Sequence, residues 1–179
     1  MRRWIALLLL LAAGCSGGAD GKTTLLIYSP HGKELLTEYE KKFEAQNPNI
    51  DVRWLDMGSQ TALDRVRSEK ANPQADLWWG APSTMFSQAE REGLLDAYKP
   101  TWADHIDPAS HSPNDFWYGT YQTPEVIAYN TEALKPDTAP QDWDDMLDPK
   151  WKGKVILRDP PASGTVRTIF AARAKINAA

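Results

Sequence analysis

The chain has 179 residues, with 20 lysines and arginines against 24 aspartates and glutamates, so its net charge is −4. This acidic balance lacks the electrostatic footprint of a nucleic-acid-binding protein, and a mean hydropathy of −0.52 excludes a polytopic membrane protein. The single cysteine excludes both a disulfide framework and a four-cysteine zinc site.

The first 14 residues are predicted to be a signal peptide. Two arginines follow Met1, and the apolar run 4–13 that comes next is too short to span a membrane. The run closes on Leu11-Ala12-Ala13-Gly14-Cys15, which resembles a bacterial lipobox, although Ala12 stands where leucine is usual. We therefore expect Cys15 to carry a lipid that anchors the mature chain to a membrane, in the periplasm or at the cell surface. The alternative is an ordinary secretory signal with an incidental cysteine.

Removal of this signal leaves 165 residues with a net charge of −6. Residues 15–23 are rich in glycine and predict a flexible tether. After the tether, short apolar runs alternate with segments of helical periodicity, and the connections between them are a few residues long. Such an order predicts an α/β fold with a parallel sheet. We expect strands at 24–28, 50–55 and 75–79, and helices at 33–46, from Gly58-Ser59 to Asn72, and from Ser83 to Gly93.

The remainder of the chain has weaker patterns. Residues 99–118 are irregular and rich in proline, aspartate and serine, which indicates a surface connection. Beyond it we expect strands at 126–129 and 155–157, a short helix at 143–147, and a last helix that Ser163 caps.

Polar loops follow the predicted strands and lead into helices. In an open α/β sheet, ligands bind outside the carboxyl ends of the strands. Helix N-termini there offer free backbone N–H groups and a partial positive charge, which favour anions. Alternatively, the serines at these positions are plain helix N-caps. The loops are Ser29–Gly32, Gly58–Gln60, Gly80–Ser83 and Asp159–Thr165.

Catalytic motifs are absent from the sequence: it contains no G-x-S-x-G, S-x-x-K, H-E-x-x-H or P-loop. His105 and His111 have no recognised metal-ligand spacing, so we interpret them as solvated loop residues. His31 lies on the first strand–helix loop, where a role in binding a ligand or metal and a local hydrogen bond are equally open. Trp78 and Trp79 are adjacent on a predicted strand and face opposite sides, so one of them could approach the cleft, although core packing is expected for both. Trp117, Tyr118 and Tyr121 either wall a ligand site or pack between lobes.

Several segments together resemble a known family. They are residues 24–54, 58–80 with the run ADLWWG, 117–134, and 147–165 with the run DPKWKGK. They are similar to bacterial solute-binding proteins of ABC importers, in the group labelled ferric-iron-type, which also includes binders of phosphonates and sugar phosphates. The resemblance implies a type II periplasmic-binding-protein-like fold with two α/β lobes joined at a hinge. It assigns 24–121 to most of lobe one, 122–130 to a hinge strand, and 131–179 to the start of a truncated lobe two.

The resemblance also implies a function without covalent chemistry. The chain would capture a small anionic or ferric solute outside the inner membrane and deliver it to an ABC permease, with no cofactor. Ala81 stands where iron-binding members often have a carboxylate, so an oxyanion-bearing organic ligand is as well supported as ferric ion. The alternative is an exported sensor or enzyme domain on the same scaffold. Carried over by position, the ligand-binding residues are Ser29, His31, Gly32, Ser59, Gln60, Gly80, Ala81, Ser83, Thr123, Glu125, Ser163, Gly164 and Thr165.

Overall fold

The computed structural model describes residues 21–177. The expected signal peptide, the lipid-accepting Cys15 and tether residues 16–20 lie outside the described residues. Within the described part, no helix is long and apolar enough to cross a membrane.

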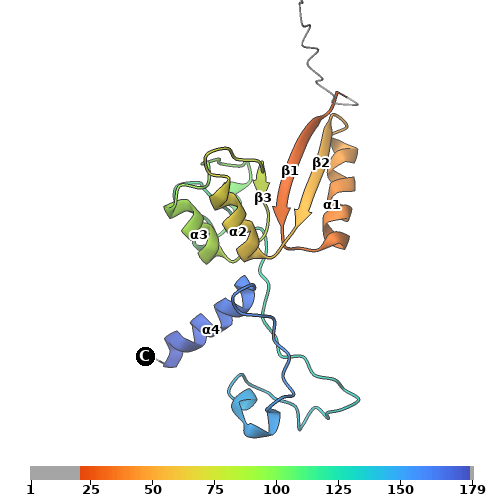
Figure 1. The fold of residues 1–179 in the computed structure, drawn as a ribbon, viewed down its shortest axis with the longest axis vertical. Coiled ribbons are helices and arrows are strands. Elements are labelled where there is room, and N and C mark those ends of the chain that lie inside the picture. The colour runs from red at the N-terminus through yellow and green to blue at the C-terminus, as the bar shows by residue number, and fades with distance from the viewer. Residues whose placement is uncertain (1–20, 178–179) are drawn as a thin grey trace, which may run out of the picture.

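A parallel three-stranded sheet organises the N-terminal part of the chain, as the sequence predicts. Its strand order is β2-β1-β3, so β1 is central and both neighbours run parallel to it. The crossover from β1 to β2 carries α1, and the crossover from β2 back across β1 to β3 carries α2; because both are right-handed and run in opposite directions, the two helices cover opposite faces (Figure 1). The strands are β1 (Thr23–Ser29), β2 (Ile50–Asp56) and β3 (Leu77–Trp78), and the helices are α1 (Lys33–Gln46), α2 (Ser59–Ser68) and α3 (Ser83–Arg91).

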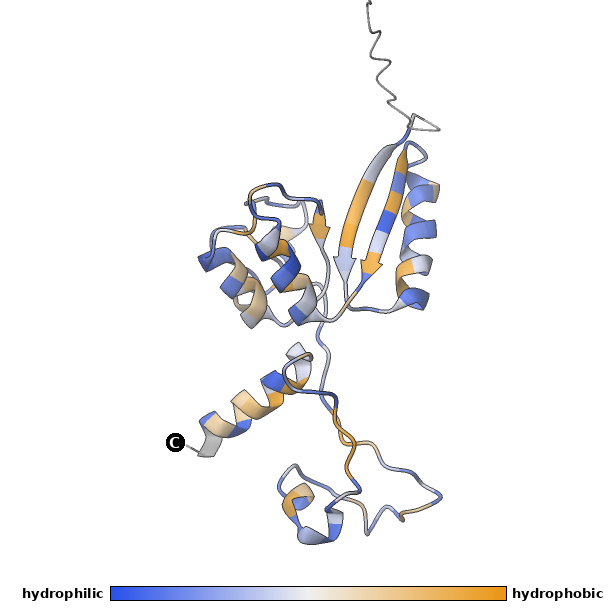
Figure 2. Ribbon diagram, viewed as in Figure 1, coloured by the Kyte–Doolittle hydropathy of each residue, from blue (hydrophilic) through white to orange (hydrophobic). Residues whose placement is uncertain are grey.

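The hydropathy of each strand matches its position in the sheet. The central strand β1 is apolar from Leu25 to Tyr28, whereas β2 alternates apolar and charged residues (Figure 2). The third strand is shorter than the predicted 75–79. Just before β3, the side chain of Asp76 takes the place of a strand carbonyl. Its carboxylate accepts the hydrogen bond from the backbone N–H of Leu26 at 2.8 Å.

The buried core lies between the sheet and the pair α2–α3. Leu63, Met85 and Ala89 form a cluster against which Trp78 packs. Tyr28 is fully buried and donates its hydroxyl hydrogen to the Glu69 carboxylate at 2.9 Å. Burial, followed by this carboxylate, raises the pKa of Tyr28. This packing fixes the helices whose N-termini face the lower edge of the sheet in Figure 1.

Beyond α3 the chain is mostly irregular until a final helix. Residues 99–118 contain two single 3-10 turns and one antiparallel bridge between His111 and Tyr118, in line with the expected surface connection. The predicted helix at 143–147 is a single 3-10 turn. The elements are η1 (Ala103–His105), η2 (Pro108–Ser110), η3 (Asp145–Leu147), η4 (Pro149–Trp151) and α4 (Gly164–Asn177).

Two predicted strands are not formed. Residues 122–130, the expected hinge strand with its apolar run 126–129, and residues 155–157 have no strand structure. A strand exists only through hydrogen bonds to a neighbouring strand, and neither segment has such a neighbour among residues 21–177. Their apolar side chains are consequently exposed, as at Ile156, which is 96% exposed. The division of the chain into lobes at this segment stays a prediction.

Candidate functional site

The carboxyl ends of all three strands lie at one edge of the sheet. The backbone N–H of Met57 donates to the Ser29 carbonyl at 2.9 Å, and that of Trp79 donates to the Tyr28 carbonyl at 2.9 Å. These bonds continue the ladder past the strands and bring the three following loops together. Ser29 is fully buried there, and its hydroxyl oxygen accepts the His31 backbone N–H at 3.3 Å.

Three helices begin at this edge without a side-chain cap. Their N-cap residues are Gly32, Gly58 and Pro82, and none makes a side-chain capping hydrogen bond. Ser59 and Ser83 are the first helical residues, so they are not the plain N-caps that the sequence left as an alternative. Their backbone N–H groups make no hydrogen bond to any described residue. The edge therefore offers unpaired donors and the positive ends of helix dipoles.

The fourth predicted loop reaches the same edge from a distant part of the chain. A β-carbon added to Gly164 would lie 2.8 Å from Pro82 Cδ, and one added to Gly58 would lie 3.3 Å from the Ala162 carbonyl oxygen. The start of α4 is thus packed between the starts of α2 and α3 (Figure 1). Ser163 is buried and caps α4 as predicted, since its hydroxyl oxygen accepts the Val166 N–H at 3.3 Å.

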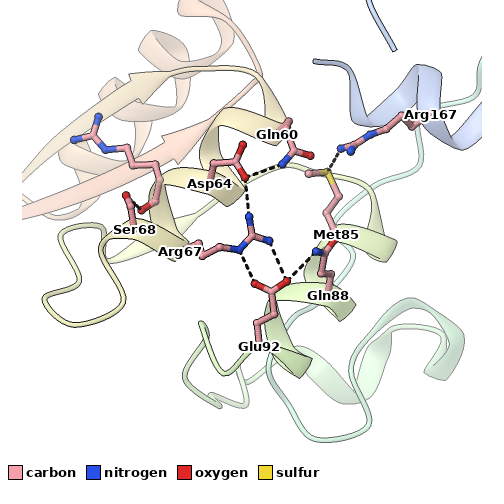
Figure 3. A network of polar contacts seen from close by, with 9 residues as sticks. Gln60, Asp64, Arg67, Ser68, Met85, Gln88, Glu92 and Arg167 are labelled. Carbon is pink, nitrogen blue, oxygen red and sulfur yellow. Dashed lines mark hydrogen bonds and ion pairs between the residues drawn. The ribbon is translucent and has the colours of Figure 1, made fainter. Parts of the chain in front are cut away.

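A polar network runs along α2 from Gln60 and clamps the C-terminal end of α2 to Glu92, the residue that follows α3 (Figure 3). Arg67 donates to both carboxylate oxygens of Glu92, at 2.8 and 3.0 Å, and to Asp64 at 2.7 Å. Hydrogen bonds from Arg67, then from Gln88, lower the pKa of Glu92 to about 2. Gln60 donates its side-chain amide to Asp64 at 2.9 Å. Because a carboxylate accepts hydrogen bonds only, the carbonyl oxygen of Gln60 is the end left for other partners.

His31 lies in an aromatic cluster on the other side of β1. Its ring packs on Gly80, whose φ of +102° and missing side chain permit the approach, since a β-carbon there would lie 2.6 Å from His31 Cε1. The Tyr121 hydroxyl lies 2.9 Å from His31 Nδ1 and also contacts Nε2. The Trp79 ring is 4.9 Å from His31 and 5.2 Å from Tyr39, between ring centroids. We call Tyr39, Trp79, Tyr121 and His31 the aromatic cluster.

Burial favours the neutral imidazole in this cluster. It lowers the pKa of His31, while the carboxylate of Asp56 acts weakly in the opposite direction. The His31 ring contacts the hydroxyl of Tyr121, which lies 90 residues further along the chain, and a role of His31 in ligand binding stays a prediction. Among residues 21–177 no three His, Cys, Asp or Glu side chains gather as a metal site would require.

Other predicted site residues lie less centrally. Ala81 packs against the core cluster of α2 and α3. Thr123 and Glu125 are exposed on the unpaired segment 122–130 and make no side-chain hydrogen bond to the described residues. A hollow of about 630 Å³ lies elsewhere, within residues 134–154, and no predicted site residue lines it.

Sequence reasoning left one feature of this edge open and missed another. Core packing was expected for Trp79, with an approach to the cleft as the alternative, and its ring faces His31 and Tyr39 while Trp78 packs inward against Phe86. Adjacent residues of a strand face opposite sides, so the sequence indicated that the two rings separate but not which one faces outward. Asp56 was not considered, although it ends β2 directly opposite Ser29.

A match between this chain and a protein-family model decides its family. A model of the bacterial extracellular solute-binding proteins matches residues 38–177. The chain belongs to this family. Curated relatives of this chain include a probable ABC transporter periplasmic-binding protein, y4fP, of Sinorhizobium fredii, 30% identical over 79% of this chain and 39% of that protein. Iron uptake protein A1 of Synechocystis is 29% identical over 74% and 36%. A putative 2-aminoethylphosphonate-binding periplasmic protein of Salmonella typhimurium is 32% identical over 71% and 37%.

Solved structures agree on the fold. The chain superposes on the periplasmic binding protein P5PA with a TM-score of 0.70 at 30% identity, over 84% of this chain and 50% of that one. AfuA from Actinobacillus pleuropneumoniae, with fructose-6-phosphate bound, gives 0.65 at 34% identity, over 80% and 47%. The chain therefore has part of the two-lobe periplasmic-binding-protein fold, and it spans about half the length or less of these relatives.

Proposed function

We propose that the chain is the solute-binding component of an ABC importer, which captures a small anionic or ferric solute in the periplasm and delivers it to a permease. Membership of the family supports this role over that of an exported sensor or enzyme. The relatives are named as binding and uptake proteins, and the proposed role requires no covalent chemistry.

One observation carries the proposal for an anion: the uncapped starts of α2 and α3 meet the start of α4. Ser59 and Ser83 supply backbone N–H groups without a partner among the described residues, and Gly164 brings a third helix dipole within van der Waals contact of Pro82. Like dipole ends repel one another unless negative charge lies between them. A phosphate, phosphonate or carboxylate at this point would satisfy the donors and offset that repulsion.

The same geometry suggests how binding is coupled to closure. The α2 and α3 starts belong to the sheet-bearing part, whereas α4 comes from beyond the 122–130 segment. An anion bound to both parts binds their closed arrangement more tightly than an open one, and so shifts the population toward closure. The permease would then recognise the loaded, closed form. We further propose that Cys15 carries a lipid that keeps the protein close to the membrane.

Thermal shift measurements on the product of the complete reading frame test this function. The panel is ferric citrate, ethylphosphonate, 2-aminoethylphosphonate, glucose 6-phosphate and, as an uncharged control, glucose. We expect at least one of the anionic or ferric compounds to raise the melting temperature in a concentration-dependent way, because a ligand that binds only the folded state stabilises it. A response to glucose alone would overturn the proposal, as would the absence of any response at millimolar concentrations.

A further inference from the structure

We propose that the aromatic cluster, together with Asp56, binds a positively charged group of the solute, so that the solute is a zwitterion. The inference rests on the anion-binding role proposed above and deepens it. The helix starts would hold the negative end, and the cluster would hold an ammonium group.

The position of the cluster supports this division. β1 is central, so the loop with His31 lies between the loop with Ser59 on one side and the loop with Gly80 on the other. Adjacent parallel strands are about 4.8 Å apart. A small solute held at the start of α2 therefore has the cluster within reach of its other end.

The chemistry of the cluster suits a cation. Tyr39 and Tyr121 are each 51% exposed, so their rings remain accessible from the solvent. The face of an aromatic ring is electron-rich and attracts ammonium groups. The protein already uses one ring in this way, since Lys42 Nζ lies 5.4 Å from the centroid of Tyr39.

One cation among the described residues lies beside the cluster, that of Lys42 at Tyr39, and it is already paired with the Glu38 carboxylate at 2.5 Å. His31 is packed against Gly80 and Trp79 in a setting that disfavours its protonated form, so it adds no positive charge to compete with a cation. Asp56 makes no ion pair with the described residues, and it ends β2 opposite Ser29, which lies two residues before His31 in the chain. Gln60, fixed by Asp64, presents its carbonyl oxygen as a further acceptor for an N–H donor.

Two matched pairs of compounds test the subsite. Ethylphosphonate lacks only the ammonium group of 2-aminoethylphosphonate, and glucose 6-phosphate has a hydroxyl where glucosamine 6-phosphate has an ammonium group. Each is titrated calorimetrically into the product of the complete reading frame. We expect the ammonium-bearing member of at least one pair to bind about tenfold more tightly than its partner, which is the size of effect a partly desolvated cation–aromatic contact gives.

Variants assign that difference to the cluster. Tyr121→Leu removes the ring and should abolish most of the preference, whereas Tyr121→Phe keeps the ring and should retain it. Tyr98→Leu, at a tyrosine that is 73% exposed outside the cluster, is the matched control and should change nothing. Retention of the full preference in Tyr121→Leu would overturn the assignment.

The outcomes separate this inference from the proposed function. Equal affinity within both pairs would overturn the cation subsite and leave the transport role intact, as would binding of ferric citrate alone. If no compound of the whole panel binds, the proposed function fails, and the subsite fails with it.

Discussion

Gly164 at the start of α4 lies against the ring of Pro82 at the start of α3, with no room for a side chain between them. A β-carbon at Gly164 would stand 2.8 Å from Pro82 Cδ and 2.9 Å from Cγ. We therefore expect Gly164→Ala to push α4 away from the sheet edge where α2 and α3 begin. Overpacking of this kind costs about 1–3 kcal/mol, so solute binding should weaken about tenfold. Calorimetric titration with the best compound of the panel measures the loss.

Helix propensity cannot explain such a loss, because alanine favours a helix more than glycine does. The double variant Gly164→Ala/Pro82→Ala removes the opposing ring atoms and should recover part of the affinity. Equal affinity of Gly164→Ala and the wild type would show that the contact between α3 and α4 is irrelevant to binding.

Gly80→Ala should destabilise the protein more than an ordinary glycine substitution at positive φ. The new β-carbon would lie 2.6 Å from His31 Cε1, with φ at +102°. Gly93→Ala is the control, since its φ of +63° is also unfavourable but its β-carbon would meet only the flexible Lys70 Nζ at 3.6 Å. We expect an additional loss of about 2 kcal/mol in the free energy of unfolding for Gly80→Ala. Equal losses in urea denaturation would mean that His31 moves aside without cost.

The clamp between α2 and α3 should make stability depend on pH in the acid range. Hydrogen bonds from Arg67 and Gln88 hold the pKa of Glu92 at about 2, below its value in an unfolded chain. Its contribution is therefore complete above pH 5 and disappears as the pH falls toward 2. The difference in unfolding free energy between the wild type and Glu92→Gln should shrink over that range.

Glu132→Gln provides the comparison for this prediction. The Glu132 side chain makes no ion pair or hydrogen bond with the described residues, so its substitution should leave the acid dependence of stability as it is in the wild type. A wild-type-minus-Glu92→Gln difference that stays constant from pH 7 to pH 2 would contradict the clamp.

Cys15→Ser tests the lipid anchor, which the sequence predicts at a position outside the described residues. The wild-type protein should incorporate labelled palmitate and fractionate with membranes, because lipidation requires the thiol. Cys15→Ser should lose the label, whereas the neighbouring substitution Ser16→Ala should keep it. Membrane fractionation of unlabelled Cys15→Ser at wild-type levels would show that the anchor lies elsewhere.

The sequence predicts the sheet well because the sheet-forming segments carry local signals. Apolar runs, helical spacing and the stops at Asn47 and Gly93 place α1, α2 and α3 within a few residues of their observed bounds. The predictions fail at 126–129 and 155–157, where the hydropathy favours a strand but no neighbouring strand lies among the described residues. Strand structure depends on that partner, which no local pattern reveals.

In the candidate site, too, some features follow from the sequence and others depend on tertiary packing. Loops at strand ends follow from topology, so the convergence of Ser29, Ser59 and Ser83 on one edge could be anticipated. The contact between Gly164 and Pro82 joins residues more than eighty positions apart, and the role of Trp79 depends on which of two adjacent tryptophans faces outward. Such relationships come from tertiary packing and required the structure.

Removing one backbone N–H donor at the start of α2 tests directly whether the helix N-termini bind the solute. Ser59 is the first residue of α2, where proline is tolerated, and Gly58 before it already has the extended conformation that proline requires, with φ −57° and ψ 150°. Ser59→Ala removes only the hydroxyl, whereas Ser59→Pro also removes the N–H. We expect Ser59→Pro to bind the best anion of the panel about tenfold more weakly than Ser59→Ala, with both variants folded. Equal affinities of the two variants would contradict this expectation.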